Sequence, residues 1–172
     1  MHENTKINEP CGANINLMCH SMGNYVLECM FQMLEKTGEI VIAVFKEVVM
    51  AAADVDWNAL EKPKSLYSIT KICDRAHVYF HKGERALALS ENWKNSLNRL
   101  GKYGPQNIWN IPQSVNILDV SDIDDDEGVM KHHYYYNSDT VVKDIIAVFN
   151  GKHTEDIKRR KFITHKNIFR LK

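Results

Sequence analysis

Short apolar runs alternate with helical patterns four times along the chain, and this alternation restricts the possible folds more than any other feature. Four runs are short enough to be strands, at residues 15–18, 48–50, 76–81 and 115–120. Segments with helical spacing follow them, at residues 23–36, 57 to about 74, 84–101 and 138–151. Ser138 is the expected cap of the last helix, and glycines follow the ends of three of them: Gly38, Gly101 and Gly151. Repeated strand–helix units predict an α/β fold, with about four parallel strands and helices on both faces of the sheet.

The length of 172 residues suits one domain with its own core. We expect a polar lead-in at 1–13, the folded domain at 14–151 and a basic tail at 152–172. No apolar run approaches the roughly 18 residues of a membrane-spanning helix, and the first ten residues do not form a secretion signal. The four cysteines show no C-x-x-C spacing, and two of them, Cys19 and Cys29, fall in apolar stretches. Buried free thiols and a cytoplasmic location are therefore expected.

The charge pattern favours neither nucleic acid nor a metal as a ligand. The formal net charge is zero, so no overall field attracts nucleic acid or a membrane. The basic cluster at 158–161 lacks interleaved aromatic side chains and is interpreted as solvated. The acidic loop from Asp122 has Glu127 and His133 where a calcium loop needs glycine and glutamate. The histidines show no zinc-ligand spacing. We expect no metal, no cofactor and no nucleic-acid partner.

The sequence MCHSMGNY, residues 18–25, places Ser21 between a predicted strand and a predicted helix. A serine hydroxyl is a poor nucleophile until a base takes its proton, and a tight strand-to-helix turn exposes it. The usual pattern is G-x-S-x-G; here Cys19 replaces the first glycine and Gly23 is the second. The helix start leaves the backbone N–H of Met22 available for a developing oxyanion. An ordinary Ser-Met-Gly turn is the alternative, but the strand before and the helix after favour a nucleophile.

Acids and histidines follow the later predicted strands, where the partners of such a serine are expected. Asp54 follows the second strand, Glu84 the third, and His132 and His133 the fourth. A histidine base needs one imidazole nitrogen on the serine and the other held by a carboxylate. Each side chain also has an ordinary interpretation, the acids at helix starts and the histidines at the surface. Their order and their loop positions favour catalysis.

Four separated motifs, INLMCHSMGNYVL, VVMAAADVDW, VYFHKGERALALS and HHYYYNS, together resemble a bacterial α/β-hydrolase family of unknown function. In that family the turn reads roughly A-H-S-M-G-N-x-V-L, and the second strand ends in A-x-D-V-D. The third leads into D-R-A-L-x-x-S, and a histidine stands before a pair of aromatic residues. The motifs keep the same order and span about residues 14–150. The resemblance implies a serine hydrolase of esterase or amidase type that acts on a small-molecule ester or amide.

Carried over by position, the resemblance implies Ser21 as the nucleophile and His132 as the base. His132 fits better than His133, because one residue separates it from the aromatic pair, as in the family. Glu84 stands where the family has aspartate and is expected to orient the histidine. Asp54 is also retained and stays the alternative acid.

The resemblance further implies that strands are missing from this chain. In α/β-hydrolases the serine follows the fifth strand of an eight-stranded sheet, whereas this chain begins just before that strand. We therefore expect a truncated, carboxyl-terminal half of the fold, with one open edge and without the loop that carries the second oxyanion donor. A homodimer or an N-terminal partner chain is expected to cover this edge. The alternative to a hydrolase is a non-catalytic remnant, or one half of a split hydrolase.

Overall fold

The structure is a computed structural model of the chain, and it describes residues 14–38, 43–87, 98–123, 132–164 and 167–172. The predicted lead-in at 1–13 lies outside the described residues. In chain order, the elements are β1 (Leu17–His20), α1 (Met22–Thr37), β2 (Phe45–Ala51), η1 (Ser65–Lys71), β3 (Cys73–Phe80), α3 (Leu100–Tyr103), η2 (Ile108–Asn110), β4 (Val115–Asp119), α4 (Tyr134–Asn137), α5 (Asp139–Phe149), η3 (Thr154–Asp156), β5 (Arg160–Thr164) and β6 (Ile168–Leu171).

The strands form one six-stranded sheet in the order β1-β2-β3-β4-β6-β5. All neighbouring pairs are parallel except β5 and β6. The four predicted strands correspond to β1, β2, β3 and β4, so the predicted α/β fold is confirmed. His20 pairs with Ala51, and Ala51 pairs with Tyr79. The carboxyl ends of the first three strands therefore meet at one edge of the sheet, where sites in parallel sheets form.

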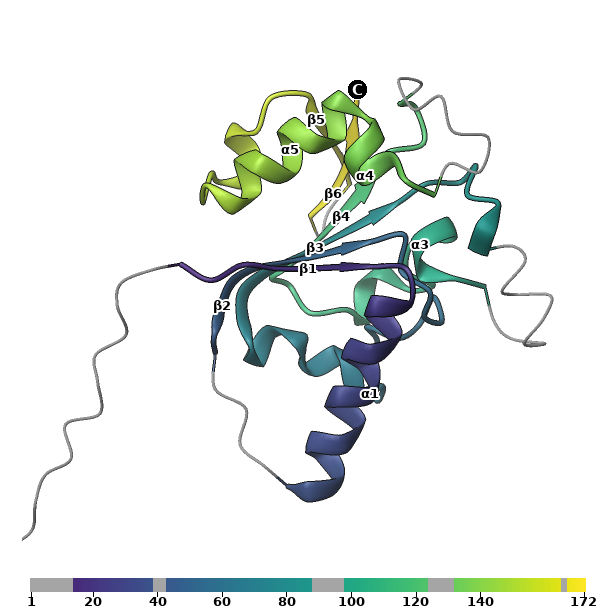
Figure 1. The fold of residues 1–172 in the computed structure, drawn as a ribbon, viewed down its shortest axis with the longest axis vertical. Coiled ribbons are helices and arrows are strands. Elements are labelled where there is room, and N and C mark those ends of the chain that lie inside the picture. Colours follow the sequence, from purple (N-terminus) through teal and green to yellow (C-terminus); the bar gives the residue numbers. More distant parts are fainter. Residues whose placement is uncertain (1–13, 39–42, 88–97, 124–131, 165–166) are drawn as a thin grey trace, which may run out of the picture.

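Helices cover both faces of the sheet, with α1 and η1 on one side and α4 and α5 on the other (Figure 1). Alternate side chains of β2 enter the two cores, because successive residues of a strand point to opposite faces. Val48 and Met50 pack with Leu27 and Phe31 of α1. Val49 belongs to the second core, which α5 closes with three apolar side chains: Val141, Ile145 and Val148. Burial on both faces explains why the inner strands are continuous apolar runs.

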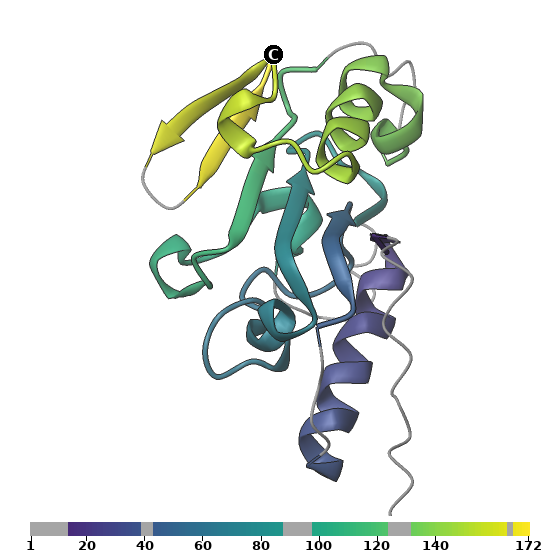
Figure 2. The same ribbon diagram turned by 90° about the vertical axis from the view of Figure 1, so that its left-hand side faces the viewer.

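The segment 152–172, expected as a basic tail, carries two further strands. β6 pairs in parallel with β4, and β5 returns antiparallel to β6, so the hairpin extends the sheet beyond β4 (Figure 2). Phe169 and Leu171 of β6 are buried in the second core. These alternating apolar positions lie within a strongly basic sequence, and the basic residues obscure the strand pattern.

Two predicted helices are wrong in the described residues. Residues 57–74 form turns and the 3₁₀ helix η1, and β3 already begins at Cys73. The helix predicted at 84–101 is interrupted, because Arg99 is extended and α3 begins only at Leu100; residues 88–97 lie outside the described residues. Gly101 does not end a helix. It packs against the loop after β2, where a Cβ atom would lie 2.2 Å from the backbone nitrogen of Ala53. A glycine is therefore required at this position because the backbone after β2 approaches it closely, and not because a helix ends there.

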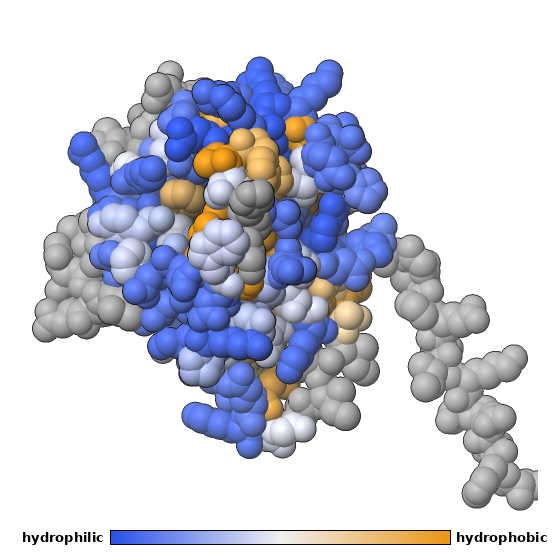
Figure 3. All heavy atoms as spheres, turned by 180° about the vertical axis from the view of Figure 1, so that it is seen from behind, coloured by the Kyte–Doolittle hydropathy of each residue, from blue (hydrophilic) through white to orange (hydrophobic). Residues whose placement is uncertain are grey.

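No helix within the described segments is both long and apolar enough to cross a bilayer. The face seen from behind in Figure 3 is mostly hydrophilic, and its apolar side chains gather in groups between charged ones. This mixture is typical of protein surfaces in contact with water.

A buried charged cluster lies between β2 and β3, away from the carboxyl ends of the strands. The His77 ring lies 2.9 Å from the Glu47 carboxylate, which also accepts hydrogen bonds from Arg75. Burial opposes the ionisation of Glu47, but the hydrogen bonds from His77 and Arg75 outweigh it and lower the pKa of this carboxyl. Burial lowers the pKa of His77, which therefore stays neutral and donates from Nε2 to Glu47.

We predict that acid destabilises the protein through His77. A histidine whose pKa is lowered by folding stabilises the native state fully above its unfolded pKa of about 6.5, and this stabilisation is lost as pH falls below that value. The free energy of unfolding in urea is therefore expected to decrease between about pH 7.5 and about pH 5.5. His77→Gln cannot titrate and should decrease less over the same range, whereas exposed His153→Gln should behave as wild type. An unchanged pH dependence in His77→Gln would contradict this assignment.

Candidate active site

Ser21 forms the turn between β1 and α1, with φ 49° and ψ −121°. A positive φ is uncommon for a residue with a side chain, and such conformations cluster at functional sites. The backbone N–H of Ser21 donates to the Ala51 carbonyl at 3.1 Å, which ties the turn to the end of β2. Although Ser21 occupies the cap position of α1, its hydroxyl makes no capping hydrogen bond. The helix therefore does not use this hydroxyl, and an ordinary capping role does not explain the serine.

Asn24 holds the serine turn in place, and the sequence analysis gave it no role. Its side chain is fully buried, and its amide nitrogen lies 3.2–3.3 Å from the carbonyl oxygens of Cys19, Ser21 and Ala51. This one side-chain amide thus connects the end of strand β1, the serine itself and the end of strand β2. The signal was present in the sequence, because Asn24 follows Gly23 in the motif S-M-G-N.

Glu84 and His132 come together at the same edge of the sheet. Nδ1 of His132 lies 3.0 Å from Oε2 of Glu84, although the residues are far apart in the sequence. The Glu84 carboxylate is fully buried, and its other oxygen accepts from the backbone N–H of Ala86 at 2.8 Å. Because the ionised carboxylate only accepts, His132 in its neutral form carries its proton on Nδ1. Its Nε2 is then the unprotonated nitrogen.

Tyr134 anchors the histidine segment to the sheet. Its hydroxyl accepts from the backbone N–H of Ala52 and donates to the carbonyl of Tyr79, both at 2.8 Å. The side chain is buried, and burial raises its pKa, so the hydroxyl keeps its proton. Two hydrogen bonds to the ends of β2 and β3 thus set the position of the residues just before α4. Tyr134 is therefore packed in the second core beside the strand ends.

His20 lies between the serine turn and the histidine segment. Its Nε2 is 3.1 Å from the backbone carbonyl of His132, and the two rings lie 4.6 Å apart. The centroid of its ring lies 4.3 Å from that of Tyr135. Burial lowers the pKa of His20. The neutral ring then donates from Nε2, because a carbonyl oxygen can only accept.

The alternative acid Asp54 and the alternative base His133 make contacts with other residues. Asp54 is buried and forms an ion pair with Arg99, with 3.2 Å between Oδ1 and Nε, while its backbone N–H donates to the Ser21 carbonyl. His133 is exposed, and its ring lies 5.2 Å from that of Tyr136. The carboxylate of Glu84 is therefore the one that meets a histidine, and that histidine is His132.

Ser21 and His132, the candidate nucleophile and base, lie in two segments that His20 connects. Within the described residues, the Ser21 hydroxyl makes no hydrogen bond to His132, and His20 provides the contact between the two segments. In enzymes without substrate, catalytic hydrogen bonds are often long and tighten only when substrate binds. Met22 begins α1, so its backbone N–H has no partner within the helix and can donate to an anion beside Ser21.

The described part of the chain contains no group of three or more histidine, cysteine or acidic side chains arranged to hold a metal ion. Cys19, Cys29 and Cys73 are free thiols, of which Cys29 is only half-buried. Burial raises the pKa of Cys19, which makes this thiol unreactive despite its position two residues before the serine.

The fold and this edge define an α/β protein of the hydrolase type, and the comparison with known families agrees. A family model described as alpha/beta hydrolase of unknown function (DUF900) matches residues 5–149. The chain belongs to this family, so the resemblance inferred from the four motifs is confirmed. No curated protein and no solved structure matched the chain.

We predict that Tyr134→Phe destabilises the protein by roughly 1–3 kcal/mol, because it leaves the buried N–H of Ala52 without its acceptor. Urea denaturation measures this difference. Tyr136→Phe is the matched control, since Tyr136 is exposed and follows in the same helix, and it should leave stability unchanged. Equal stability of the two variants would show that the Tyr134 hydroxyl does not anchor the segment.

Proposed function

We propose that this protein is a serine hydrolase of esterase or amidase type. In this proposal Ser21 attacks the carbonyl carbon of an ester or amide, His132 takes the serine proton, and Glu84 orients His132. The observation that carries the proposal is the hydrogen bond between Nδ1 of His132 and the buried Glu84 carboxylate, at the same edge of the sheet as a serine in a strained turn. Membership of an α/β-hydrolase family supports the same reaction class.

Each group has a defined task in this reaction. Glu84 keeps the His132 proton on Nδ1, so Nε2 can accept the proton of the Ser21 hydroxyl as the oxygen attacks. The imidazolium that forms is stabilised by the Glu84 carboxylate and later gives its proton to the leaving alcohol or amine. The N–H of Met22 donates to the oxyanion of the tetrahedral intermediate. Water then attacks the acyl-enzyme, with His132 again as the base.

His20 is a positioning residue in this proposal. Its hydrogen bond to the backbone carbonyl of His132 links the residue next to the nucleophile directly to the base. Because the ring is neutral, it places no positive charge beside His132. The Tyr135 ring also packs against the His20 ring, with 4.3 Å between the two centroids. The serine turn and the base are thereby held at the same edge.

A fluorophosphonate probe tests the proposal, because it reacts only with an activated serine. The wild-type protein should form a covalent adduct that mass spectrometry locates at Ser21, and Ser21→Ala should not react. Ser65→Ala, which removes a surface serine that bonds to Glu35, should react as wild type. Absence of an adduct on folded wild-type protein would overturn the proposal, as would equal labelling of Ser21→Ala.

A second candidate follows from the surface of α1 and the edge of the sheet. Leu27 and Phe31 face the core, yet the opposite side of α1 is also apolar: Met22, Val26 and Met33 are 60, 66 and 67% exposed. A helix that is apolar on two faces is typical of a buried position. Beside it, β1 pairs with β2 alone among the described strands, which leaves backbone groups of the edge unpaired.

We propose that a second copy of this chain covers the α1 and β1 surface, whether or not the protein is a hydrolase. The exposed stripe of α1 carries no charge, so it is complementary to itself across a two-fold axis and brings no like charges together. A homodimer, not an N-terminal partner chain, is therefore the occupant that we propose. In this second candidate the chain acts as one half of an assembly.

Light scattering after size-exclusion chromatography tests the homodimer. The wild-type mass should be that of two chains, and Val26→Glu with Met33→Glu should yield monomers. The control is Ile146→Glu, which places the same charge at an exposed apolar position of α5. A monomeric, well-folded wild-type protein would contradict this proposal, and so would a dimer that persists in the double variant.

A further inference from the structure

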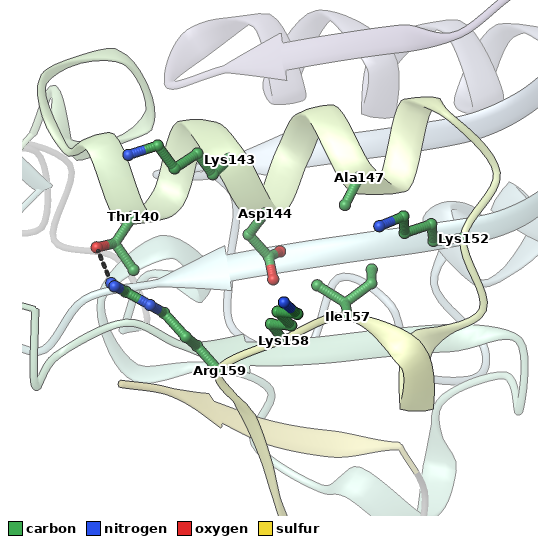
Figure 4. A pocket seen from close by; sticks show the side chains of 8 residues that line it. All are labelled: Thr140, Lys143, Asp144, Ala147, Lys152, Ile157, Lys158 and Arg159. Carbon is green, nitrogen blue, oxygen red and sulfur yellow. Dashed lines mark hydrogen bonds between the residues drawn. The ribbon is translucent and has the colours of Figure 1, made fainter.

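A cationic pocket of about 250 Å³ lies between α5 and the segment that leads into β5 (Figure 4). Four basic side chains line it: Lys143 of α5, Lys152 after the helix, and Lys158 and Arg159 before β5. Apolar walls are provided by Ala147 and Ile157. The formal net charge of the whole chain is zero, so this density of positive charge is local. None of the residues of the candidate active site lines this pocket.

The one carboxylate in the pocket wall is already neutralised. Asp144 accepts two hydrogen bonds from Arg160, at 2.6 and 2.8 Å, and a third from the Tyr79 hydroxyl at 2.6 Å. The side chains of Asp144 and Arg160 are both 1% exposed, so this ion pair is a fixed part of the wall. Nη1 of Arg160 is buried and has no hydrogen-bond partner among the described residues. The guanidinium thus retains one unused donor, which is buried.

The positive charges at the mouth have few counter-ions. Lys143 pairs with Asp139 on the exposed side of α5, where water screens the pair. Lys152 and Lys158 make no ion pair in the described part of the chain, and Figure 4 shows them on either side of Ile157. Arg159 is held in place, because its Nη1 donates to the Thr140 hydroxyl at 2.8 Å. Lys152 and Lys158 thus have no carboxylate partner in the described part of the chain, whereas Arg159 extends toward Thr140 at the other end of α5 (Figure 4).

We propose that this pocket binds a phosphate group of a small molecule. A phosphate monoester carries nearly two negative charges at neutral pH and three acceptor oxygens, which matches Lys152 and Lys158 better than a single carboxylate would. The lysines act as point charges, and Arg159, bound to Thr140, adds positive charge at the other end of the pocket. Ala147 and Ile157 contact the carbon skeleton that carries the phosphate. The pocket is large enough for a phosphate with a small organic group.

Isothermal titration calorimetry with pyrophosphate and with inorganic phosphate tests the site directly on the full chain. Wild-type protein should bind at one site per chain, with an affinity that falls as salt is added. Lys152→Ala with Lys158→Ala should weaken binding at least ~10-fold, since each removes a charge-assisted contact. Lys161→Ala is the matched control, because Lys161 is an exposed lysine of β5 outside the pocket, and it should bind as wild type.

A second arm distinguishes the source of the phosphate. Vesicles of phosphatidylcholine, with and without phosphatidic acid, present the same group on a membrane. Binding of pyrophosphate in solution identifies a soluble ligand, whereas binding only to vesicles with phosphatidic acid, lost in the double variant, identifies a lipid headgroup. The proposal is overturned if neither phosphate nor vesicles bind saturably, or if the double variant binds as tightly as Lys161→Ala. Serine labelling is independent of this result.

Discussion

One tyrosine hydroxyl connects the two halves of the candidate active site. Tyr134 accepts from the N–H of Ala52 and donates to the carbonyl of Tyr79, and both of these residues lie at the carboxyl ends of strands. The same strand end, through Ala51, receives the N–H of Ser21. The serine turn and the segment that carries His132 are therefore fixed to a common edge. Since parallel pairing aligns β1, β2 and β3, this edge is a consequence of the sheet, and the buried tyrosine hydroxyl attaches the histidine segment to it.

Much of this arrangement could be predicted from the sequence, because its signals are local. Apolar runs followed by helical spacing predicted the four parallel strands, and the motif around Ser21 predicted the turn. Glu84 and His132 were among the predicted partners because both follow strands. The resemblance favoured Glu84 over Asp54, but the pattern could not show that Arg99, from a distant segment, pairs with Asp54. Asn24 and the strand β6 were missed for a similar reason: a buried amide and a strand at the edge are recognisable only by their partners in space.

The two sides of the sheet carry different surfaces, and this difference separates the proposed roles. On one side, α1 is apolar both toward the core and away from it, as is typical of a helix that another chain covers. On the other side, α5 and the segment before β5 gather basic groups around the neutralised Asp144. The Glu47 carboxylate with the neutral His77 ring hydrogen-bonded to it, and the ion pair Asp144–Arg160, both lie beneath that second side, where they are shielded from water. Burial of ion pairs does not by itself stabilise a fold, but the loss of one partner leaves a costly unpaired charge. Substitutions can therefore alter the candidate active site, the α1 surface and the cationic pocket one at a time.

The central claim is that Glu84 holds the proton of His132 on Nδ1 and leaves Nε2 free to act as the base. Nitrogen-15 NMR of the imidazole groups measures this tautomer directly, with His132→Gln assigning the signal. We predict a protonated Nδ1 with a strongly downfield proton, an unprotonated Nε2 near neutral pH, and loss of the downfield proton in Glu84→Gln. A neutral His132 protonated on Nε2, or a spectrum that Glu84→Gln leaves unchanged, would contradict the account.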